Sequence, residues 1–139
     1  MTNNYPADLF GKSCAEILAE IHHIRSLGSS FRFTVSQHKK FNIAIKNAEA
    51  AVSKNSAFIS FVHKTPTFYL FIIFKSFLKT GNKLDTFEEY YTKAMGKDKQ
   101  SPYGLKFFKL YKKSFEEFYR LSNYMNTAKT IVATKFSPK

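Results

Sequence analysis

Apolar residues recur at intervals of three and four along most of this chain, and this spacing constrains the fold more than any other feature. An α-helix has about 3.6 residues per turn, so residues at this spacing lie on one helical face. The pattern occurs in three long segments, at Ile17, Ile21 and Ile24, at Phe41, Ile45, Ala48 and Val52, and from Leu105 to Met125. We therefore predict an all-α fold in which each helix buries one stripe in a shared core.

Residues that start and stop helices support this prediction in the first third of the chain. Ser13 and Glu16 are spaced as a capping box, and Gly28 stands where a left-handed C-terminal cap is expected. These signals predict a helix over 14–27. A second helix is predicted over 38–53. Between the two, an extended linker should press Phe31 and Phe33 into the core.

The middle of the chain contains the most apolar segment. Residues 56–63 suit a short helix or a short strand, and we favour the helix. Thr65 as N-cap and Pro66 in the first turn then open a helix over 66–79. Because this helix is apolar nearly all round, we expect it to be central, with the other helices around it. Its apolar run of seven residues is too short to cross a bilayer core of roughly 30 Å.

Two further helices are predicted after Gly81. Asp85 and Glu88 indicate a helix start, and Gly96 indicates its stop. Pro102 should open the longest helix, over 102–131. No repeat or long linker divides the 139 residues, of which 44% are hydrophobic. We expect one compact domain of about five or six helices, with residues 1–8 and 133–139 flexible.

The net charge of +12 is the main indication of a binding partner. Residues 1–53 carry six basic and four acidic side chains, and residues 54–139 carry sixteen and six, so the positive field is assigned to the C-terminal part. Such a field attracts nucleic acid, an acidic membrane face or an acidic protein. The alternative is codon bias, because nineteen of the 22 basic residues are Lys, as an AT-rich genome would produce. Scarce Arg favours phosphate contacts over the reading of guanine edges.

The segment from Tyr103 to Leu121 combines aromatic rings with basic side chains. Helical winding alone explains this alternation if one face is core and the other is solvated. The alternative is a basic ridge whose exposed rings stack on the bases of a single strand. The candidate residues for binding nucleic acid or another polyanion are Lys106, Lys109, Lys112, Lys113, Arg120, Tyr103 and Phe107.

Signals for catalysis and for metal binding are weak. Glu20 and His23 have the spacing used by di-iron helix bundles, but the sequence has no second copy of this motif. Cys14 has no partner cysteine, so a small buried thiol is expected. We therefore expect no metal, no cofactor and no enzymatic activity.

One short segment has the spacing of a known family. The separation of Arg32 and His38 resembles that of helical RNA-cleaving domains of the HEPN type, although Phe33 replaces the polar residue that usually follows the Arg. This resemblance covers two residues, and it implies an RNase only as a distant alternative function.

The sequence therefore predicts a non-catalytic, basic helical module that docks on a polyanion, most readily nucleic acid or a ribonucleoprotein, through its C-terminal lysines. The alternative is an accessory subunit of a larger protein complex, which could lie against a membrane and contact an acidic protein surface. The N-terminus has no secretory signal pattern, and a single cysteine cannot form an internal disulfide. We expect an intracellular location.

Overall fold

The computed structural model describes residues 6–80 and 105–136, and both stretches are helical without strands. The elements are η1 (Ala7–Leu9), α1 (Cys14–Ser29), α2 (Val35–Lys54), α3 (Ser56–Lys64), α4 (Thr67–Thr80) and α6 (Leu105–Phe136). The all-α prediction is confirmed, as is the choice of helix over strand for residues 56–63. The helix predicted between Asp85 and Gly96, and the start predicted at Pro102, lie outside the described residues.

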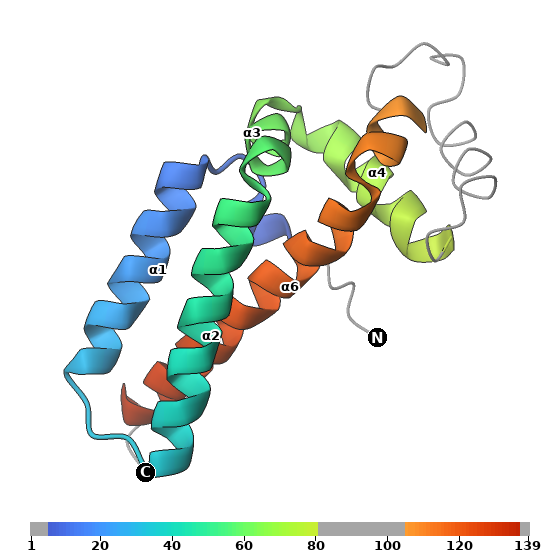
Figure 1. Cartoon of the computed structure of the whole chain (residues 1–139). Coiled ribbons are helices and arrows are strands. Elements are labelled where there is room, and N and C mark those ends of the chain that lie inside the picture. Colours follow the sequence, from blue (N-terminus) through green and yellow to red (C-terminus); the bar gives the residue numbers. More distant parts are fainter. Residues whose placement is uncertain (1–5, 81–104, 137–139) are drawn as a thin grey trace.

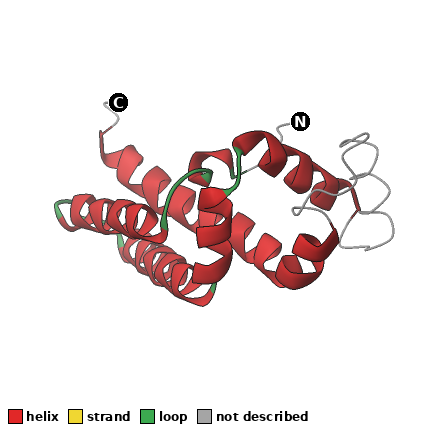
Figure 2. Ribbon diagram, turned by 90° about the horizontal axis from the view of Figure 1, so that it is seen from above, coloured by secondary structure: helices red, strands yellow, loops and turns green. Residues whose placement is uncertain are grey.

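Three long helices form the body of the bundle. In Figure 1, α1 and α2 run antiparallel, and α6 crosses behind α2. The short helix α3 continues from the end of α2 and leads to α4, which lies at one end of the bundle beside the first turns of α6 (Figures 1 and 2).

Capping boxes define where α1 and α2 begin. Ser13 Oγ accepts from the Glu16 amide at 3.1 Å, and the Glu16 carboxylate accepts from the Ser13 amide at 3.0 Å, as predicted. Thr34 and Gln37 form the same reciprocal pair at α2. This second box makes α2 start three residues earlier than the apolar spacing predicted.

Gly28 is not a left-handed cap, which corrects the prediction. It lies within α1, and among the described glycines only Gly11 has a positive φ, of 79°. A Cβ atom at Gly28 would lie 2.3 Å from Cζ of Phe41. The missing side chain lets the buried ring of Phe41 on α2 pack directly against α1.

The linker between α1 and α2 follows the prediction. Residues 31–34 are not helical, and Phe31 and Phe33 are half-buried against the core. The Phe33 ring packs on the Phe41 ring, with 5.3 Å between the centroids.

Thr65 does not cap α4 as predicted. Its hydroxyl donates to the carbonyl of Phe61 at 2.7 Å, and this bond closes α3. The carbonyl of Pro66 accepts from the amides of Tyr69 and Leu70 and opens α4. The last carbonyls of a helix lack amide partners from a following turn, so the Thr65 hydroxyl serves the end of α3 rather than the start of α4.

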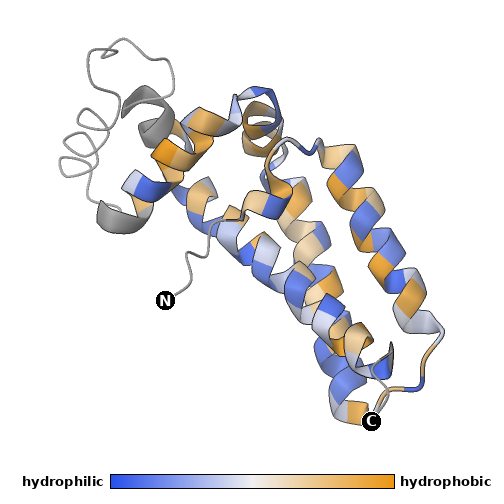
Figure 3. Cartoon of the chain, turned by 180° about the vertical axis from the view of Figure 1, so that it is seen from behind, coloured by the Kyte–Doolittle hydropathy of each residue, from blue (hydrophilic) through white to orange (hydrophobic). Residues whose placement is uncertain are grey.

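The other described helices cover α4 on one side only, so it is not central as predicted. Leu70, Ile73 and Phe74 are fully buried, whereas Phe68 is 68% exposed and Phe71 is 41% exposed. Figure 3 shows hydrophobic residues concentrated on this helix. Apolar side chains therefore occur both on the buried face of α4 and on its exposed face.

The long C-terminal helix is confirmed, with one break. Phe115, Phe118, Leu121 and Met125 are buried, as the predicted stripe requires. The predicted continuous helix is interrupted at Tyr111, whose φ of −113° and ψ of 19° are not helical. The Tyr111 ring packs there on Phe58 of α3, at 5.2 Å between centroids.

The core has an aromatic end and a small-residue middle. Phe58 is 1% exposed, and its ring contacts those of Phe74, Phe115 and Phe118. Along α2 the residues facing the core include Ala44, Ala48 and Ala51. These small side chains let α6 pack closely against α2 along much of its length.

Candidate polyanion-binding surface

The structure places only part of the predicted basic ridge. Lys112, Lys113 and Arg120 are exposed on α6. Lys106, Phe107 and Lys109 lie in the first turns of α6, where the backbone is described and the side chains are not. Tyr103 lies outside the described residues. Stacking of the Tyr103 and Phe107 rings on bases therefore stays a prediction.

The exposed cations of α6 differ in their surroundings. Arg120 lies 3.9 Å from Glu116 and 3.6 Å from Glu117, so two neighbouring carboxylates partly neutralise it. No carboxylate of the described residues lies within ion-pair distance of Lys112 or Lys113. Within the described parts of the chain, the charge of these two lysines is therefore not compensated.

All six acidic side chains in the described parts of the chain are engaged with other protein groups. Glu16 caps α1, and Asp8 accepts from the Ser122 hydroxyl at 3.4 Å. Glu49 binds Arg25 and lies 3.5 Å from His22 Nε2. The remaining three are Glu20, Glu116 and Glu117, which pair with Lys or Arg.

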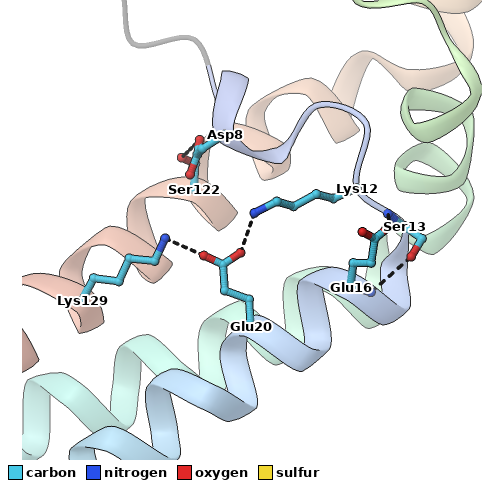
Figure 4. Close-up of polar contacts among 7 residues, drawn as sticks. All are labelled: Asp8, Lys12, Ser13, Glu16, Glu20, Ser122 and Lys129. Atoms are coloured by element: carbon cyan, nitrogen blue, oxygen red, sulfur yellow. Dashed lines mark hydrogen bonds and ion pairs between the residues drawn. The ribbon is translucent and has the colours of Figure 1, made fainter.

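Glu20 joins three parts of the fold. Its carboxylate binds Lys12 at 2.8 Å and Lys129 of α6 at 2.6 Å, as Figure 4 shows. Partial burial alone would raise the pKa of Glu20, but the hydrogen bonds from the two lysines outweigh it and lower that pKa. The carboxylate therefore stays charged and holds the segment before α1 and α6 against α1.

We expect Glu20→Gln to lower the free energy of unfolding by about 1 kcal/mol or less at pH 7, because the ion pairs are partly exposed. A lowered pKa means that the folded protein gains stability above the ordinary Glu pKa and loses it as the pH falls through the lowered one. Urea unfolding of wild type and variant should therefore show a difference that shrinks from pH 7 to pH 3. The control is Glu116→Gln, which changes a more exposed carboxylate. If the difference in free energy of unfolding between wild type and Glu20→Gln does not change with pH, the ion pairs of Glu20 do not stabilise the fold.

The remaining cations show where the net positive charge resides. Ten basic side chains in the described residues have neither an ion pair nor a hydrogen bond to another described side chain: Arg32, Lys39, Lys40, Lys46, Lys54, Lys64, Lys75, Lys112, Lys113 and Lys135. Of these, Lys135 lies over the ring of Phe33, with Nζ 5.7 Å from the ring centroid. Four of these ten lie on α2. The regional charge count placed Lys39, Lys40 and Lys46 in a segment whose charge Glu20 and Glu49 partly offset, whereas both glutamates bind other groups.

A groove lies between α2 and α6 where the two sets of cations meet. Its volume is about 210 Å³. Its lining residues are Asn47, Ala50, Ala51, Lys54, Glu117, Arg120 and Tyr124. It therefore brings a free lysine of α2 next to the predicted Arg120.

The residues considered for chemistry do not assemble into a site. No cluster of three His, Cys, Asp or Glu in residues 6–80 and 105–136 could hold a metal ion. Cys14 Sγ is half-buried and donates to the carbonyl of Ser56 at 3.6 Å. Arg32 lies exposed in the linker, and His38 lies in the first turn of α2 with Nε2 3.0 Å from Asn42 Nδ2.

Comparisons with protein-family models, curated proteins and solved structures found no match for this chain. Within the described residues, no helix combines the length and the apolar character needed to cross a membrane.

Proposed function

We propose that this protein is a non-catalytic binding module that docks on nucleic acid or a ribonucleoprotein through lysines of its C-terminal part. The observation that supports this proposal is the charge pairing. The described carboxylates are all used within the fold, and Lys112 and Lys113 remain exposed without a partner among the described residues. Exposed lysines without carboxylates suit a ligand that supplies many negative charges.

The chemistry of the side chains favours contact with phosphates over reading of bases. Lys is a compact point charge, whereas specific contacts to guanine use the planar fork of Arg. Arg120, the one Arg among the predicted site residues, is paired with Glu116 and Glu117. The module should therefore bind different sequences with similar affinity.

Replacing Lys106, Lys109, Lys112 and Lys113 by Gln should weaken binding to all sequences alike. Each lost phosphate contact should reduce the slope of log affinity against log salt by about 0.7 on a single strand and about 0.9 on a duplex. For four contacts the slope should thus fall by about 2.8 on a single strand and about 3.6 on a duplex. Fluorescence anisotropy of labelled oligonucleotides at several salt concentrations measures it.

Two controls test whether the loss of binding comes from lost phosphate contacts. Oligonucleotides of equal length and different sequence test whether recognition is confined to the backbone. Circular dichroism of the variant tests whether it remains folded. Wild-type binding that does not change with salt would refute the proposed contact with phosphates.

A second candidate, an accessory subunit of a protein complex, is favoured by exposed apolar side chains near one end of the bundle. Phe68 on α4 is 68% exposed, and Leu110 on α6 is 72% exposed. Such side chains occur at protein interfaces. A pull-down with and without nuclease separates the candidates, because partners held through nucleic acid are lost after nuclease treatment and direct protein partners are retained.

A further inference from the structure

We infer that the outer side of α2 is a second contact surface for the phosphate backbone of nucleic acid, formed by Lys39, Lys46 and Lys54, here called the α2 stripe. This inference rests on the proposed function and deepens it, because it assigns contacts to a helix that the regional charge count left nearly neutral. All three side chains are exposed and carry no ion pair among the described residues.

Helical spacing places the α2 stripe opposite the core. The side of α2 that faces α1 and α6 buries Phe41, Ile45, Ala48 and Val52. Lys39 and Lys46 are seven residues apart, which is about two turns and about 10 Å along the axis. Lys46 and Lys54 are eight residues apart, or about 12 Å. The three charges therefore follow one side of the helix over about 22 Å.

No negative charge interrupts this side of α2. The residues between the lysines include Ile43, which is 48% exposed, and the exposed Ala50. Glu49 is the one acidic residue of α2, and it is turned toward α1, where it binds Arg25. An anion along the α2 stripe would therefore meet lysines without a competing carboxylate on the same helix.

The backbone under the α2 stripe is fixed before any ligand binds. The Thr34 and Gln37 capping box holds the first turn, with hydrogen bonds of 3.0 and 3.1 Å. The buried side of the helix packs against α1 and α6. Because this backbone is already ordered, binding carries no added cost for ordering the helix, beyond the general cost of association and the ordering of the lysine side chains.

The α2 stripe is continuous with the predicted ridge on α6. Lys54 lines the groove between the two helices together with Arg120. Lys113 lies seven residues before Arg120, which is about two turns of the same helix. A strand running along α2 could thus reach cations of both helices in one path.

Nucleic acid fits this surface better than a membrane does. Duplex DNA carries one charge per about 1.7 Å of its axis, so a row about 22 Å long meets phosphates in any register. A helix that binds a membrane surface inserts an apolar face. The apolar face of α2 is already buried in the core, and Ile43 is the one large apolar residue exposed between the lysines.

The test compares two pairs of equal charge in the full-length protein. Lys39→Gln with Lys46→Gln removes two charges from the α2 stripe, and Lys64→Gln with Lys75→Gln removes two exposed, unpaired charges elsewhere. The probes are a labelled single strand and a labelled duplex, titrated at several salt concentrations. We expect the first pair to lower the salt slope by about 1.4 on the single strand and about 1.8 on the duplex, and the second pair to leave it nearly unchanged.

The outcomes separate this inference from the proposed function. Equal slopes for the two pairs, with wild type still binding in a salt-dependent way, would overturn the α2 surface and leave the proposed function in place. Failure of wild type to bind either oligonucleotide at low salt would overturn both. If the first pair loses binding to vesicles rich in anionic lipid but keeps its oligonucleotide affinity, the α2 stripe faces a membrane and our inference is wrong.

Discussion

Replacing Phe74 by Ala is expected to lower the free energy of unfolding by about 3 to 5 kcal/mol, a large share of the stability of a small domain. Phe74 is fully buried, and its ring lies 5.1 Å from that of Phe115 and 5.5 Å from that of Tyr119. Alanine would remove these contacts and leave a cavity between α4 and α6. Urea unfolding followed by circular dichroism measures the loss.

Phe68 on the same helix is the matched control. Its side chain is 68% exposed, so Phe68→Ala should change stability by about 0.5 kcal/mol or less. The contrast between the two variants assigns the buried face of α4. Equal losses for Phe68 and Phe74 would mean that both faces are covered, as the sequence analysis expected for a central helix.

Replacing Gly28 by Val should destabilise the protein by about 1 to 3 kcal/mol, although Val is a better helix former than Gly. A Cβ at this position would lie 2.3 Å from the ring of Phe41, which is 4% exposed and has little room to move. Either the ring or helix α1 must shift, and both shifts disturb the core. The midpoint of urea unfolding reports the loss.

A double-mutant cycle identifies the cause of this loss. In a Phe41→Leu background the ring is absent, so the additional cost of Gly28→Val should fall by about 0.5 to 3 kcal/mol. Ser26→Ala on the exposed side of α1 controls for helix propensity and should be nearly neutral. A Gly28→Val cost that is the same with and without the Phe41 ring would exclude the steric explanation.

Local signals in the sequence were sufficient for most helices. The capping box at Ser13 and the spacing of the apolar residues depend on groups within four residues of each other, so they can be recognised without the tertiary structure. The same applies to the buried stripe from Phe115 to Met125. Gly28 and Thr65 were assigned wrongly because their roles depend on Phe41 of another helix and on the end of α3.

The candidate surface was less predictable than the helices. The sequence pattern predicted Lys112 and Lys113, which are exposed and have no ion pair among the described residues. It missed Lys39 and Lys46, although their seven-residue spacing was visible in the sequence. Helical spacing alone could have placed them opposite the core, but it does not reveal which carboxylates remain free to neutralise them.

Composition and contacts within a helical turn were enough to predict the all-α class, the main helical faces and the excess of positive charge. Where that charge is uncompensated among the described residues depends on contacts between distant parts of the chain. Glu20 pairs with Lys12 and Lys129, and the latter is more than one hundred positions away. Ion pairs form between groups that folding brings within about 4 Å, so a count along the chain cannot predict which lysines are left for a partner.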